Sequence, residues 1–228
     1  MSELANRYHE VLGRIEAAAK AAGRLAEEIT LVTVTKNHPT SLALELLDLG
    51  AKNFGENRDQ EAAPKAKEVA QQSQIAPIWH FIGQLQTNKV KSVLEYASFL
   101  HSLDRPSLLT ELQKRCIGRG ESIKVFIQVN LTDDVGRGGI EPEELDGFAD
   151  QVVKSEGIEL VGLMGVAGLA TDAARDFERM AGFSKRLQLS HPSASGLSIG
   201  MSGDYEVAIG YGATHLRIGT AITGNRSY

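Results

Sequence analysis

Apolar residues along the chain follow two spacings, one typical of strands and one typical of helices. Short apolar runs bounded by polar or glycine-containing segments predict strands at residues 31–36, 53–54, 78–82, 98–101, 123–129, 160–164, 197–199 and 215–218. Apolar residues three or four positions apart predict helices at residues 41–50, 58–72, 87–96, 106–119, 142–155, 173–189 and 203–211. A further helix precedes the first strand, between Ser2, a suitable N-cap, and Gly23, which can end a helix.

The predicted strands alternate with helices, which is the order of parallel βαβ units. Eight such units predict an α/β fold, a closed (β/α)₈ TIM barrel, with the extra helix in front of it. A doubly wound open sheet is the alternative fold. No linker, repeat or shift in composition divides the chain, so we expect a single domain over residues 1–228.

Charge and cysteine content narrow the classes of function. The 228 residues carry 24 Lys and Arg against 29 Asp and Glu, a net charge of −5, which argues against nucleic acid as a partner. The first helix carries charged side chains throughout and no basic amphipathic helix is present, so we expect neither a secretory signal nor membrane association. A single cysteine, Cys116, and the lack of HxH or HExxH spacing predict no disulfide and no metal site. These features favour a cytoplasmic protein.

In a barrel of this kind, functional residues lie at the carboxyl ends of the strands. Alternation places Val32, Val34 and Lys36 on one face of the first strand, so we expect Lys36 at the rim of the barrel. A lysine against apolar walls loses hydration, its pKa falls, and its free amine forms a Schiff base with carbonyl compounds. The alternative is an ordinary lysine that extends from a strand end into solvent.

Glycine-rich turns follow the last two predicted strands, at residues 198–204 and 217–221. Loops in these places often bind phosphate, because backbone N–H groups and hydroxyls there point at the anion. Ser202, Thr220 and Arg217 would add donors and a positive charge, although Gly and Ser also serve as plain turn residues. A reactive lysine with a phosphate site suggests pyridoxal 5′-phosphate (PLP), with phosphorylated sugars as the alternative. Arg137, in another glycine-rich loop, is a further candidate anion contact.

A set of short motifs matches one known family in order along the chain. The motifs are residues 34–36 (VTK), 54–57 (FGEN), 79–83 (WHFIG), 85–89 (LQTNK), 101–104 (HSLD), 162–164 (GLM), 197–202 (LSIGMS) and 217–222 (RIGTAI). In this set, the chain resembles the pyridoxal phosphate homeostasis proteins, which are single-domain relatives of the alanine racemase barrel. The resemblance extends over almost the whole chain, and no one motif carries it alone.

The resemblance implies a (β/α)₈ barrel in which Lys36 holds PLP as a Schiff base. It implies that the phosphate is bound by Ser202, Gly203, Gly219 and Thr220. Further cofactor-binding residues, by the same resemblance, are Asn57, His80, Ser102, Met164, Ser198, Met201 and Arg217. Arg217 corresponds to an arginine near the cofactor and faces either the ring nitrogen or the phosphate. His80 can alternatively be a core histidine with its hydrogen bonds satisfied.

The function that the resemblance implies is a carrier that buffers PLP in vitamin B6 and amino-acid homeostasis. Apo forms of PLP-dependent enzymes are the expected recipients, and no catalytic residue is assigned. The alternative is a PLP-dependent, racemase-like enzyme, which needs a second base; Tyr205 and Tyr211 follow the seventh strand but fit helix positions. A Schiff-base aldolase acting on sugar phosphates needs an acid beside the lysine that the strand ends do not offer. Because the racemase's dimerising domain has no counterpart here, we expect a monomer.

Overall fold

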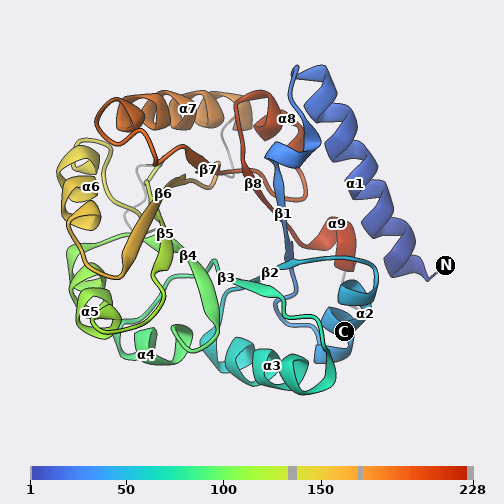
Figure 1. Cartoon of the computed structure of the whole chain (residues 1–228). Coiled ribbons are helices and arrows are strands. Elements are labelled where there is room, and N and C mark those ends of the chain that lie inside the picture. The colour runs from blue at the N-terminus through green and yellow to red at the C-terminus, as the bar shows by residue number, and fades with distance from the viewer. Residues whose placement is uncertain (1, 133–137, 169–171, 225–228) are drawn as a thin grey trace.

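Eight parallel strands form a closed barrel at the centre of the molecule, in the order β1 to β8 (Figure 1). The computed structural model describes residues 2–132, 138–168 and 172–224, so Arg137 lies outside the described residues. The strands are β1 (Thr30–Val34), β2 (Asn53–Glu56), β3 (Ile78–Phe81), β4 (Ala97–Leu103), β5 (Ile123–Gln128), β6 (Ile158–Met164), β7 (Gly196–Ser198) and β8 (His215–Ile218). Since β1 pairs with both β2 and β8, the predicted (β/α)₈ barrel is confirmed and the open sheet is wrong.

Helices surround the barrel in a ring, and one extra helix, α1, lies outside it next to α8 and α9 (Figure 1). Their bounds are α1 (Glu3–Ala21), η1 (Ala26–Glu28), α2 (Thr40–Asp48), α3 (Asp59–Gln72), η2 (Thr87–Lys89), α4 (Val90–Val93), α5 (Pro106–Cys116), α6 (Leu145–Val153), α7 (Ala173–Ser190), α8 (Tyr205–Gly210) and α9 (Thr220–Thr223). Ser2 caps α1 as predicted, because its Oγ accepts the N–H of Ala5 over 3.2 Å. None of the described helices is long and apolar enough to cross a membrane.

The barrel interior is packed with side chains and is not a channel. Stacked and tilted rings fill it, with centroids of contacting pairs 4.4–6.4 Å apart; they belong to His80, Phe99, His101, Phe126 and His215. Such a filled interior leaves the carboxyl ends of the strands as the place where a ligand can bind.

The extra helix α1 is tied to the last two helices by arginine side chains. Arg7 donates its Nε–H to the carbonyl of Ile222 in α9 over 2.7 Å. Arg14 forms a bidentate ion pair with Glu206 of α8, from Nε to Oε1 over 3.0 Å and from Nη2 to Oε2 over 2.8 Å. The helix thus fixes the elements that follow β7 and β8, which carry the predicted phosphate-binding turns.

Candidate functional site

The two glycine-rich turns, one after β7 and one after β8, lie against each other. The Oγ atom of Ser202 accepts the backbone N–H groups of Gly219 and Ala221, each over 3.2 Å. Within the described residues, the N–H groups of Ser202, Gly203 and Thr220 have no hydrogen-bond acceptor. Gly219 joins the two turns through Ser202, and the free N–H groups of Ser202, Gly203 and Thr220 form a donor set of the kind that binds phosphate oxygens.

Lys36 lies at the same end of the barrel, in the turn after β1. This strand runs beside β8, and a Cβ atom at Gly219 would be 3.4 Å from the Cβ of Val34. The Lys36 side chain is exposed to solvent, so the predicted enclosure by apolar walls is wrong. The reason is that β1 ends at Val34, which leaves Lys36 beyond the last hydrogen-bonded rung. Any special reactivity of this amine must come from its position rather than from burial.

Arg217 projects into the mouth from β8 and is almost fully buried, with 5% of its surface exposed. Its Nη1 donates to the carbonyl and the hydroxyl oxygen of Ser198, over 2.7 and 2.5 Å, and its Nη2 donates to the carbonyl of Gly165 over 2.9 Å. Burial lowers the pKa of the guanidinium to about 10, so it stays charged at neutral pH. Arg217 is therefore a fixed cation bonded to the ends of β6 and β7.

A chain of hydrogen bonds runs from Arg217 across the barrel interior. His101 Nδ1 lies 2.8 Å from Ser198 Oγ, His101 Nε2 lies 2.9 Å from His80 Nδ1, and His80 Nε2 lies 3.0 Å from Asn53 Oδ1. Arg217 donates to Ser198 Oγ. If both imidazoles are neutral, Ser198 can then donate to His101, His101 to His80, and His80 to Asn53. Burial is the main cause that lowers the pKa of both imidazoles well below the usual value.

His80 is thus a core histidine with both ring nitrogens bonded, which is the second of its two sequence interpretations. It lies one step further from Arg217 than His101, which contacts Ser198 directly. Among the described residues, no group of three or more His, Cys, Asp or Glu side chains could hold a metal ion.

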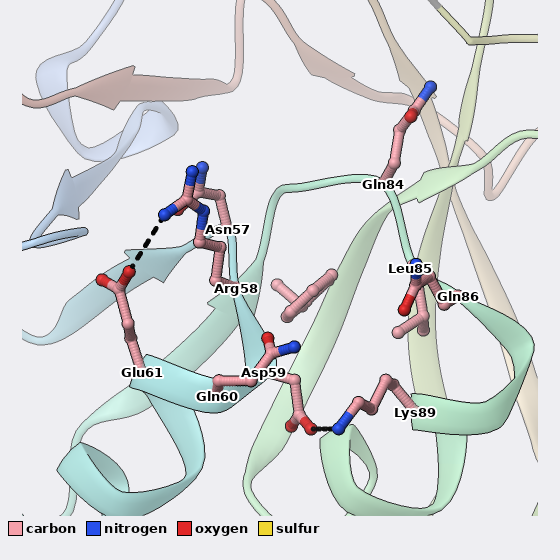
Figure 2. A pocket seen from close by; sticks show the side chains of 10 residues that line it. Asn57, Arg58, Asp59, Gln60, Glu61, Gln84, Leu85, Gln86 and Lys89 are labelled. Atoms are coloured by element: carbon pink, nitrogen blue, oxygen red, sulfur yellow. Dashed lines mark hydrogen bonds and ion pairs between the residues drawn. The ribbon is translucent and has the colours of Figure 1, made fainter.

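Asn57 lies between β2 and α3 on the wall of a cavity of about 500 Å³ (Figure 2). Its Oδ1 is buried and has no hydrogen-bond partner among the residues that the structure describes. Two ion pairs line other parts of this cavity, Arg58 with Glu61 at 3.5 Å and Asp59 with Lys89 at 3.8 Å. An unpartnered carbonyl oxygen beside a polar cavity is an acceptor that a ligand N–H or O–H can satisfy.

The other predicted residues differ in how accessible they are. Met164, which is buried, ends β6 opposite Ser198 of β7. Met201 lies in the turn before α8 with 37% of its surface exposed. Ser102 is fully buried, and its hydroxyl donates to the carbonyl of Gly83, so this donor already holds the loop after β3.

Sequence reasoning missed a buried ion pair next to Lys36. Lys65 of α3 and Glu56 of β2 are 5% and 0% exposed, and their Nζ and Oε1 atoms lie 2.6 Å apart. Burial raises the pKa of the Glu56 carboxyl, and the bonds from Lys65 and Thr35 offset that effect only in part. Glu56 was recognisable as a polar residue at a strand end, whereas Lys65 looks like any other helix lysine in the sequence.

The chain matches known proteins over almost its whole length. The sequence profile of the family described as "Alanine racemase, N-terminal domain" matches residues 12–227. The protein named pyridoxal phosphate homeostasis protein in Escherichia coli K12 is 38% identical over 231 residues, covering 100% of this chain and 99% of the relative. Its namesake in Mycobacterium tuberculosis H37Rv is 39% identical over 241 residues, covering 99% of this chain and 93% of the relative.

A solved structure gives the same result. PipY of Synechococcus elongatus, determined with PLP bound, superposes with a TM-score of 0.83 at 32% identity, covering 97% of this chain and 100% of PipY. The chain therefore belongs to the alanine racemase N-terminal domain family, within the group of proteins named pyridoxal phosphate homeostasis protein.

Proposed function

We propose that this protein binds PLP at the mouth of its barrel and holds it covalently on Lys36, as a component of vitamin B6 and amino-acid homeostasis. The observation that carries the proposal is the joining of the Ser202 and Gly219 turns at the end of the barrel where Lys36 follows β1. An amine and a phosphate-binding donor set at one mouth suit the aldehyde and the phosphate of PLP. PipY, at 32% identity, is solved with PLP bound, which supports PLP as the ligand here.

The residues present fit this cofactor. The unpaired N–H groups of Ser202, Gly203 and Thr220 would take the phosphate, and Gly219, bonded to Ser202 Oγ, would hold the two turns together around it. The unpartnered Oδ1 of Asn57 offers an acceptor for a polar group of the ligand. The rest of the proposed pocket consists of Ser102, Met164, Ser198, Met201 and Arg217, and His80 would support it from the barrel core through His101 and Ser198. When bound, PLP supplies an aldehyde that condenses with amines and a ring that withdraws electrons.

We propose that the protein carries PLP rather than turning over an amino acid. Arg217 is already bonded to the ends of β6 and β7, which favours a place beside the ring over one at the Ser202 turn. An arginine at the ring nitrogen keeps the ring unprotonated and weakens its electron withdrawal.

A second base, as a racemase needs, is not supplied by Tyr205. Its ring is buried under the guanidinium of Arg14 from α1, 5.5 Å from ring centroid to Cζ. We further propose that the carrier is a cytoplasmic monomer that passes PLP to apo-enzymes. Racemisation of L-alanine faster than free PLP achieves would contradict the carrier role.

The binding proposal is tested by borohydride reduction of the protein with PLP, followed by mapping of the modified peptide by mass spectrometry. We expect the reduced adduct on Lys36 and the loss of the visible absorption band of bound PLP in Lys36→Ala. Lys52→Ala is the matched control, because Lys52 is also exposed but precedes β2 at the opposite end of the barrel. An adduct spread over many lysines, or equal binding by Lys36→Ala, would overturn the proposal.

A further inference from the structure

The backbone on both sides of Lys36 is held by side chains of one helix, α3. Ahead of Lys36, the carbonyl of Thr35 accepts a hydrogen bond from Lys65 Nζ over 2.8 Å. After Lys36, the N–H of Asn37 donates to Glu61 Oε2 over 2.9 Å. Glu61 and Lys65 are four residues apart, so they lie one above the other on the face of α3 that meets this turn.

The Lys65 contact is rigid because it belongs to a buried cluster. Glu56 Oε1 accepts both Lys65 Nζ, over 2.6 Å, and the hydroxyl of Thr35, over 2.7 Å. The cluster ties together the end of β1, β2 and α3. Burying two charges costs desolvation energy that their attraction does not reliably return, so stability alone is a weak reason for this pair. Fixing the carbonyl next to Lys36 is a role that its geometry explains.

The Glu61 contact holds a backbone conformation that would otherwise be unfavourable. Asn37 has φ 63°, and it is the one described non-glycine residue with positive φ. Asparagine tolerates this region, but a single residue held there still needs support from its surroundings. Glu61 provides support through the N–H of Asn37, and its other oxygen pairs with Arg58 (Figure 2).

We propose that Glu61 and Lys65 are positioning residues that fix the direction in which Lys36 leaves the backbone, so that its exposed amine meets the PLP aldehyde. This inference rests on the proposed function of Lys36. An exposed lysine has many rotamers, and fixing its first bond restricts the amine to the region over the mouth.

The test compares Glu61→Ala with Glu61→Gln, since glutamine keeps an oxygen that can accept the N–H of Asn37. We expect Glu61→Ala to weaken PLP binding and slow formation of the Lys36 adduct about tenfold, while Glu61→Gln stays close to wild type. Glu68→Ala is the matched control, because Glu68 lies on the same helix and accepts a bond from the Thr40 hydroxyl over 2.6 Å, not from the backbone beside Lys36. Wild-type affinity and rate in Glu61→Ala would overturn the inference.

The buried cluster is tested with the paired change Lys65→Met and Glu56→Gln, which removes both charges together. We expect a folded protein with slower adduct formation at Lys36. Because this variant can fail to fold, Glu61→Ala remains the deciding change.

Hydrogen exchange of the amides of residues 36–38 in the PLP-free protein separates the two proposals. Faster exchange in Glu61→Ala, but not in Glu61→Gln or Glu68→Ala, supports the proposed role of Glu61 in holding the backbone beside Lys36. This holds even if no Lys36 adduct forms in wild type. Unchanged exchange in Glu61→Ala contradicts the positioning role of Glu61 and does not affect the proposal that PLP binds at Lys36.

Discussion

The turn that carries Ser202 depends on one residue, Gly200. Its φ is 90°, and a Cβ atom there would lie 2.7 Å from the Cβ of Ala208 in α8. We expect Gly200→Ala to destabilise the protein by about 1–3 kcal/mol, because the new methyl group forces α8 outward in a strained backbone region. Urea unfolding measures this.

Gly210→Ala is the control for that change. Gly210 is the last residue of α8, and a Cβ atom there would meet open space. It should leave stability unchanged or raise it, because alanine is the better helix former. A Gly200→Ala protein as stable as wild type would show that α8 moves without cost.

At the same residue scale, the sequence predicted positions better than environments. The order of strands and helices correctly placed Lys36 at the carboxyl end of β1, because that inference needs only the position of the apolar run in the chain. Its exposure depends on where β1 ends, which the period does not give. Lys65 was missed because its contact with Glu56 joins a helix to a neighbouring strand, and nothing in the local pattern marks a helix lysine as buried.

At the scale of elements, the attachment of α1 rests partly on Arg24, three residues after the helix ends. Arg24 donates from Nη1 to the carbonyls of Ile209 and Ala213, over 3.1 and 2.8 Å, at the end of α8. We expect Arg24→Met to destabilise the protein by about 1–3 kcal/mol, because both carbonyls lose a charged donor. Thermal or urea unfolding measures the change.

Arg115→Met is the comparison for the Arg24 change. Arg115 pairs with Glu111 one turn earlier in α5, where both side chains are accessible to water. We expect Arg115→Met to leave the free energy of unfolding almost unchanged. Equal effects of the two substitutions would mean that α1 is not held through Arg24.

Strands, short ones included, and long helices were predictable, whereas the shortest helices were not. The strands at 123–129 and 160–164 correspond to β5 and β6, because a continuous apolar run of this length between polar segments is typical of a buried parallel strand. The predicted helix at 87–96 is a 3₁₀ turn followed by the four-residue α4. β-Branched Thr87, Val90 and Val93 disfavour a longer helix there. Helix α9 lies in the glycine-rich tail, where no helix was predicted; its single turn is too short to show a period.

At the scale of the whole molecule, the buried histidines predict how stability depends on pH. Burial lowers the pKa of His80 and His101 well below 6.5, and that of His215 to about 4. In the unfolded chain these histidines take up protons near their ordinary pKa of about 6.5, whereas the folded protein does not. Their contribution to stability is therefore complete above that pH and is lost as the pH falls below it.

The comparison of wild type with His80→Gln isolates this effect, because the carboxyl groups contribute equally to both proteins. Below about pH 6.5, we expect the wild-type stability to fall more steeply, by about 1.4 kcal/mol per pH unit for the one histidine removed. Chemical denaturation at a series of pH values gives the two slopes. Parallel slopes would mean that the folded protein accepts the proton at His80.

Closure of the barrel by its first and last strands has a consequence for synthesis. Thr30 of β1 pairs with His215 of β8, which lies near the other end of the sequence. During synthesis, one edge of β1 therefore stays unpaired until β8 has left the ribosome. The turn with Lys36 is made early, yet its neighbours Ser202, Gly219 and Thr220 are made last. An unfinished chain therefore has Lys36 without the two glycine-rich turns, and the proposed PLP site would arise only once the barrel has closed.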